Sequence, residues 1–133
     1  MYVLDTSTIS DYLRGNKNII AKLRQTPRPL VFTTSITKFE LEYGLIKKPK
    51  LRKVYKEQLD LLFEQINLLE FGKNEAITAA RIKDQLFKAG TPIGLEDLMI
   101  GAITLTEGFT VVTSNLKHFR QIENLKVEDW KSD

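Results

Sequence analysis

Short apolar runs alternate with longer segments of helical periodicity along the whole chain, and this alternation restricts the fold more than any other feature of the sequence. Runs of this kind, rich in Val, Ile, Leu and Thr, predict strands at residues 2–4, 30–34, 66–71, 110–113 and 125–127. Parallel strands need crossover connections, which are usually helices that then cover both faces of the sheet. We therefore expect an α/β fold, a central parallel sheet sandwiched by helices.

The segments between these strands carry apolar residues at intervals of three and four, which predicts amphipathic helices. Gly90 and Gly108 are placed to end two of them, and Ser35 is a good N-cap for a third. The predicted helices cover residues 6 to about 13, a stretch around 19–23, 36–47, a long segment around 51–63, 76–89, 95 to about 106, and 116–122.

The composition is that of one compact domain spanning residues 1–133, with 42% hydrophobic residues and no cysteine. The lack of cysteine excludes thiol chemistry and cysteine-bound zinc, and it is typical of a reducing compartment. We find no signal peptide and no apolar run that approaches a membrane span, so we expect a cytoplasmic protein without a membrane partner. A net charge of +3 permits nucleic-acid binding but does not establish it.

Polar residues directly follow two of the predicted strands. Asp5 follows the first strand, and Thr113, Ser114 and Asn115 follow a later one. In open parallel sheets, ligands bind at the carboxyl ends of the strands, which places both groups at the functional edge. Asp5 also has a purely structural interpretation as the N-cap of the next helix.

Two further carboxylates lie on helices that are otherwise apolar. Helical spacing places Glu40 on the same face as Phe39 and Tyr43, where it must reach solvent, pair with a cation or bind a ligand. Asp97 lies in a segment that is apolar almost all round, where an unpaired carboxylate costs several kcal/mol. A structural ion pair is the alternative for Asp97, whereas its neighbour Glu96 is expected to face solvent.

Three carboxylates that converge would raise one another's pKa unless a cation lies among them. Oxygen ligands favour Mg²⁺ or Mn²⁺, which can activate water and stabilise the charge that builds on a phosphate. Other chemistries fit poorly, because His118 is the only histidine and no Gly-rich phosphate loop is present. A phosphatase of the haloacid dehalogenase type would need a second acid where Ser7 stands.

Four segments, in order, resemble the motifs of PIN-domain nucleases, and within them the VapC-type toxins of bacterial toxin–antitoxin pairs. They are Val3-Leu4-Asp5-Thr6-Ser7, Thr37 to Gly44 with Glu40 as the acid, Gly90 to Ile100 with Asp97 as the acid, and Val111 to Asn115 followed by Phe119. Each motif is weak alone, but the four in this order and spacing cover essentially the whole chain.

The resemblance implies a Mg²⁺- or Mn²⁺-dependent endoribonuclease with Asp5, Glu40 and Asp97 as metal ligands and Asn115 as a further catalytic residue. It also implies a VapB-type antitoxin that covers the site, and a homodimer. Many relatives carry Asp where Asn115 stands, and some carry an acid near His118. We therefore expect the site to hold one metal firmly and a second only when a substrate phosphate is present. A PIN-like RNA- or protein-binding module without strong catalysis is the alternative.

Finer details are less specific. Residues 90–100 and 127–130 resemble the subgroup of toxins that cut initiator tRNA in its anticodon loop. The basic stretch that contains Lys47, Lys48, Lys50, Arg52, Lys53 and Lys56 could follow an RNA backbone, although such a run is as often a solvated face.

Overall fold

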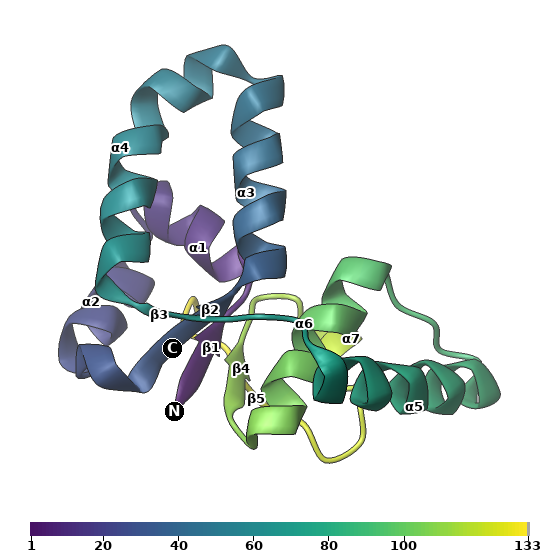
Figure 1. Ribbon diagram of the computed structural model, residues 1–133. Coiled ribbons are helices and arrows are strands. Elements are labelled where there is room, and N and C mark those ends of the chain that lie inside the picture. Colours follow the sequence, from purple (N-terminus) through teal and green to yellow (C-terminus); the bar gives the residue numbers. More distant parts are fainter. Residues whose placement is uncertain (133) are drawn as a thin grey trace.

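A five-stranded parallel sheet forms the centre of the computed structural model, which describes residues 1–132 (Figure 1). The strand order is β3-β2-β1-β4-β5, and every neighbouring pair is parallel. The strands are β1 (Tyr2–Leu4), β2 (Val31–Thr34), β3 (Asn67–Leu69), β4 (Thr110–Val112) and β5 (Lys126–Glu128). The helices are α1 (Thr6–Leu13), α2 (Lys17–Gln25), the 3-10 turn η1 (Arg28–Leu30), α3 (Ser35–Lys47), α4 (Pro49–Gln65), α5 (Lys73–Ala89), α6 (Leu95–Glu107) and α7 (Leu116–Phe119). The predicted α/β class and parallel sheet are confirmed.

Two hydrophobic cores lie on opposite faces of the sheet. On one face, α1 to α4 pack around Leu4 and Val112 of the central strands. On the other face, α5, α6 and α7 pack around Val111. Alternate residues of β4 thus point into different cores, as the pleat requires, and the sheet is covered on both sides.

The centre of the sheet brings the ends of β1 and β4 together. β1 lies between β2 and β4, with Leu4 paired to Val112. The Asp5 amide extends this ladder by donating to the Val112 carbonyl at 3.0 Å. The residues that follow β1 and β4 therefore lie side by side at the carboxyl edge of the sheet.

Helices α3 and α4 form a hairpin that projects beyond the sheet (Figure 1). The turn between them is short, because α3 ends at Lys47 and Pro49 is already the first residue of α4. Pro suits a first helical position, since its missing N–H has no partner there in any case.

Several predicted boundaries were wrong by a few residues. Helix α3 begins at Ser35, and Thr34 rather than Ser35 is its N-cap, with Thr34 Oγ1 accepting from the Thr37 amide at 3.0 Å. Helix α5 begins three residues earlier than predicted, because Glu75 Oε1 accepts from the Gly72 amide at 3.0 Å and so stabilises the first turn. Strand β3 and helix α7 are shorter than predicted. Within residues 1–132, no helix has the length and apolarity needed to cross a membrane.

Candidate active site

Asp5 lies directly after β1 and is buried, with 2% of its surface exposed. Its Oδ1 accepts from the Thr8 amide at 2.9 Å, so Asp5 is the N-cap of α1. Hydroxyl groups of Ser7 and Thr113 also donate to its carboxylate, at 2.8 and 2.5 Å. Burial raises the pKa of Asp5, and these donors oppose that shift. The capping role is thus confirmed, and it fixes the carboxylate at the sheet edge.

Glu40 lies on α3 and faces the first turn of α1. Thr6 Oγ1 donates to Glu40 Oε1 at 2.5 Å. Burial raises the pKa of Glu40, and the negative charges of Asp97, Glu96 and Asp5 raise it further. Three carboxylates from other elements of the fold thus act electrostatically on Glu40.

The surroundings of Glu40 differ from the sequence-based interpretation in one respect. Phe39 and Tyr43, which share its helical face, are 61% and 53% exposed, so this apolar stripe is not buried. The buried side chains of α3 are Thr37, Leu41 and Leu45. Periodicity identified a stripe with apolar members but not which stripe the fold buries.

Asp97 is in the first turn of α6, where its side chain is 22% exposed. Asp97 is thus only partly buried, because the buried part of α6 begins at Leu98. Asn115 Nδ2 donates to Asp97 Oδ2 at 3.0 Å, and His118 Nδ1 lies 3.0 Å from the same oxygen. His118 Nδ1 is also 2.8 Å from Asn115 Nδ2. Two polar side chains, Asn115 and His118, thus lie against one oxygen of Asp97.

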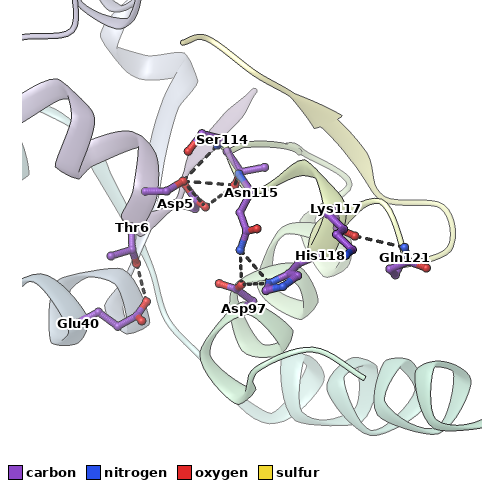
Figure 2. A network of polar contacts seen from close by, with 11 residues as sticks. Asp5, Thr6, Glu40, Asp97, Ser114, Asn115, Lys117, His118 and Gln121 are labelled. Carbon is purple, nitrogen blue, oxygen red and sulfur yellow. Dashed lines mark hydrogen bonds and ion pairs between the residues drawn. The ribbon is translucent and has the colours of Figure 1, made fainter. Parts of the chain in front are cut away.

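The three predicted acids face a common space at the carboxyl edge of the sheet (Figure 2). No lysine or arginine in residues 1–132 forms an ion pair with Asp5, Glu40 or Asp97. Asp97 therefore lacks the lysine or arginine partner of the structural ion-pair interpretation, and the base beside it is His118, 3.0 Å from its Oδ2. Convergence is only partial, however, since no three Asp, Glu or His side chains of the described residues are grouped closely enough to form a metal cage.

The partial convergence of the three carboxylates is compatible with a hydrated divalent cation such as Mg²⁺. Mg²⁺ keeps several of its waters and is commonly bound through one or two carboxylates together with substrate phosphates. Oxygen donors without a neutralising cation, at the ligand-binding edge of a parallel sheet, fit such an ion. Zinc would instead need a compact set of nitrogen or sulfur ligands.

Sequence reasoning missed the hydroxyl groups that hold the carboxylates. Thr6 and Ser7 adjoin Asp5, and each donates to an acid of the site. Ser7 Oγ also accepts from the Ser114 amide at 3.2 Å, which links the segments after β1 and β4. The available signal was the run of hydroxyl residues directly after the first acid.

A groove of about 340 Å³ adjoins Glu40 and lies between α1, α3 and α4. Leucine side chains of these three helices line much of its surface, together with Tyr55. Arg14, Lys47 and Lys48 also line it. The groove thus combines apolar and cationic groups next to the acidic site.

A sequence profile described as the PIN domain matches residues 2–125. The chain belongs to the PIN domain family. Over 98% of both chains, this PIN domain is 28% identical to Ribonuclease VapC2 of Rickettsia felis. It is 29% identical to the tRNA(fMet)-specific endonuclease VapC of Salmonella typhimurium, over 97% of each chain.

Comparison with solved structures also shows that this PIN domain is similar to VapC-type proteins. The DNA-bound VapBC complex from Salmonella typhimurium contains a chain that matches with a TM-score of 0.89 and 28% identity over 97% of both chains. VapBC2 from Rickettsia felis, bound to a DNA fragment from its promoter, matches with a TM-score of 0.89 and 26% identity, over 97% of this chain and 98% of that one. The resemblance to VapC-type PIN domains drawn from the sequence is confirmed.

Proposed function

We propose that this PIN domain, as one domain over residues 1–133, is the endoribonuclease toxin of a VapBC-type toxin–antitoxin pair and requires Mg²⁺ or Mn²⁺. The observation that carries the proposal is the partial convergence of Asp5, Glu40 and Asp97 at one sheet edge, where none of the three has a lysine or arginine partner within residues 1–132. Relatives of nearly equal length that are named ribonucleases support it.

Asp5, Glu40 and Asp97 would hold the metal. Asp5 is fixed by its buried hydrogen bonds, and Glu40 is oriented by the Thr6 hydroxyl. Asn115 and His118 engage Oδ2 of Asp97, which leaves Oδ1 without a hydrogen-bond donor among residues 1–132. When bound, a divalent metal supplies an activated water and stabilises the charge that develops on the phosphate. The role of the protein is then to position the three carboxylates and to bind the RNA beside them.

The proposed substrate is structured RNA, and the anticodon loop of a tRNA is the first RNA to test. The Salmonella typhimurium relative is named as specific for tRNA(fMet), which supports that choice. We place the activity in the cytoplasm, where tRNA is found.

The proposed protein partners are a VapB-type antitoxin and a second copy of the chain. The structures with matching chains are described as VapBC complexes, which supports the antitoxin. Groups of exposed apolar side chains support the homodimer, because contiguous apolar patches on a protein surface often mark protein–protein interfaces. They include Phe39, Tyr43 and Ile46 on α3, and Phe87 and Leu95 near the junction of α5 and α6.

Cleavage of purified tRNA tests the proposal. Cleavage should stop in EDTA, return with Mn²⁺ or Mg²⁺, and be lost in Asp5→Asn and Asp97→Asn. Glu64→Gln, on the exposed side of α4, is the control and should cleave as the wild type does. RNA binding without metal-dependent cleavage would instead support a PIN-like binding module, for which the neutral Asn115 is the motivating observation.

A further inference from the structure

We propose that the basic tip of the α3–α4 hairpin binds RNA phosphates next to the cleavage site. The hairpin tip is defined here as the cations Lys47, Lys48, Lys50, Arg52 and Lys53. This inference rests on the proposed function, because it assigns a binding surface to the same RNA substrate.

The cations of the hairpin tip are exposed and not neutralised. All five are exposed, and none forms an ion pair with a carboxylate within residues 1–132. Lys56, one turn further along α4, differs, since Glu42 and Asp60 lie 2.7 and 2.8 Å from its Nζ. The positive charge of the tip is thus available to a ligand, whereas that of Lys56 is balanced within the fold.

Local helix stability does not explain these cations. Lys50, Arg52 and Lys53 lie in the first turns of α4, which has no acidic residue in its first turn. The partial positive charge at a helix N-terminus disfavours cations there by about 0.3–1 kcal/mol each. Only Lys47, in the last turn of α3, has a favourable position relative to its helix. Most cations of the hairpin tip therefore lower the stability of α4, and binding of an anionic ligand would offset this loss.

The groove connects the hairpin tip to the acidic site. Glu40, Lys47 and Lys48 all line it, and the hairpin carries the tip away from the sheet edge (Figure 1). Seven residues separate Glu40 from Lys47 on the same helix, which corresponds to about 10 Å at the rise of an α-helix. A nucleic-acid strand with a charge about every 3.4 Å spans this distance in about three nucleotides. One strand can thus place a phosphate at the acids and others at the tip.

Regular negative charge is the ligand property that the tip favours. Its five cations occupy seven consecutive positions, interrupted only by Pro49 and Leu51. Lysine and arginine that neutralise phosphates make RNA binding strongly dependent on salt. An acidic protein segment would make a different pattern of contacts, and the experiment separates the two ligands.

The test measures binding of a fluorescein-labelled RNA stem-loop to the full chain by fluorescence anisotropy. EDTA is present throughout, so the result does not depend on metal or cleavage. The tip variant combines Lys47→Gln, Lys48→Gln and Arg52→Gln. We expect at least about a tenfold loss of affinity at moderate salt, and a plot of log K against log salt that is shallower by about 2.

Two variants control for charge and folding. Lys17→Gln, Lys22→Gln and Arg24→Gln remove the same number and kind of cations from α2, all of them exposed. This control should bind RNA within about twofold of the wild type. The second control combines Lys47→Arg, Lys48→Arg and Arg52→Lys. It keeps the positive charge of the hairpin tip and should also preserve RNA binding. A tip variant that fails to bind while its charge-retaining counterpart binds thus reports on charge.

Three results would overturn the inference. The tip variant could bind RNA with wild-type affinity and salt dependence, or the α2 control could lose as much affinity as the tip variant. The tip substitutions could also weaken binding of a labelled oligoglutamate peptide and leave RNA binding unchanged, which would assign the tip to a protein partner. The nuclease proposal fails on a different result, the absence of metal-dependent cleavage by the unaltered chain.

Discussion

The Thr6 hydroxyl donates to the Glu40 carboxylate at 2.5 Å, and this contact joins the first turn of α1 to the middle of α3. It favours the charged form of Glu40 and so opposes burial and three neighbouring carboxylates, which raise the pKa of this acid. Thr6 directly follows Asp5, so the backbone that fixes one acid of the site also supplies the donor for a second.

Removing the Thr6 hydroxyl should weaken RNA cleavage without abolishing it. Thr6→Val keeps the shape of the side chain and leaves Glu40 without its hydroxyl donor, so we expect kcat/KM for RNA cleavage to fall about tenfold. Thr6→Ser retains the hydroxyl and is the matched control, with activity near that of the wild type. Equal activity of the valine and serine variants would show that the hydrogen bond does not orient Glu40 for catalysis.

Neutralising Glu40 should stabilise the metal-free protein at neutral pH. Because the folded-state pKa of Glu40 is raised above 4.5, its contribution to stability is present below that pH and is lost as the pH rises through the folded-state pKa. Glu40→Gln avoids this loss, so its Tm in EDTA should exceed that of the wild type by about 2–4 °C near neutral pH. Differential scanning fluorimetry across a pH series measures the difference.

The same series contains its own controls. The Tm difference between Glu40→Gln and the wild type should shrink as the pH falls toward the ordinary pKa of a glutamate. Added Mn²⁺ should reverse the order at neutral pH, because the ion stabilises the folded state that binds it better. Glu64→Gln, with its exposed side chain, should show no such pattern. A Tm difference that does not change with pH would rule out charge as the cause.

The sequence predicted the architecture well and the site only in part, for physical reasons. Strands such as β4 are short and apolar between turn residues, so their order with the helices specified a parallel sheet. Asp5 and Asn115 could be placed because the carboxyl end of a parallel strand is defined by the strand itself. The position of Glu40 relative to Asp97 could not be predicted from the sequence, because it depends on how α3 packs against α6. The distances between carboxylates follow from this packing, as does the exposure of Phe39.

Asn115 should act on metal binding through Asp97. Its amide donates to Asp97 Oδ2, and its backbone N–H donates to Thr113 Oγ1 at 2.8 Å, which in turn donates to Asp5. Asn115→Ala removes the side-chain contacts to Asp97 and His118 and keeps the backbone contact. We expect Mn²⁺ affinity to fall by about 10- to 100-fold, as for other groups that orient metal ligands. Isothermal titration calorimetry with Mn²⁺ measures this directly.

Asn115→Asp makes the opposite change at the same position, because it adds a negative charge beside Asp97 and removes the amide donor. With metal bound, we expect tighter Mn²⁺ binding than in the wild type, as a further anionic oxygen attracts the cation. Unchanged Mn²⁺ affinity in both variants would mean that Asn115 has no part in the metal site.

Helix α6 closely approaches the segment that follows α7, the helix that carries His118. A Cβ at Gly101 would lie 2.5 Å from Ile122 Cδ1, and Ile122 is buried with 3% exposure. Gly101→Ala should therefore destabilise the protein by about 1–3 kcal/mol in urea denaturation, as overpacking does in other cores. Ile122→Val removes the clashing methyl group. Adding Gly101→Ala to Ile122→Val should therefore cost much less stability than adding Gly101→Ala to the wild type.

Gly44→Ala is the control, because a methyl group there would meet no neighbouring atom within 4 Å. Alanine also favours a helix over glycine by about 1 kcal/mol, so this variant should not be destabilised. If the two alanine variants had the same stability, close packing at Gly101 would not be what holds α6 against this segment.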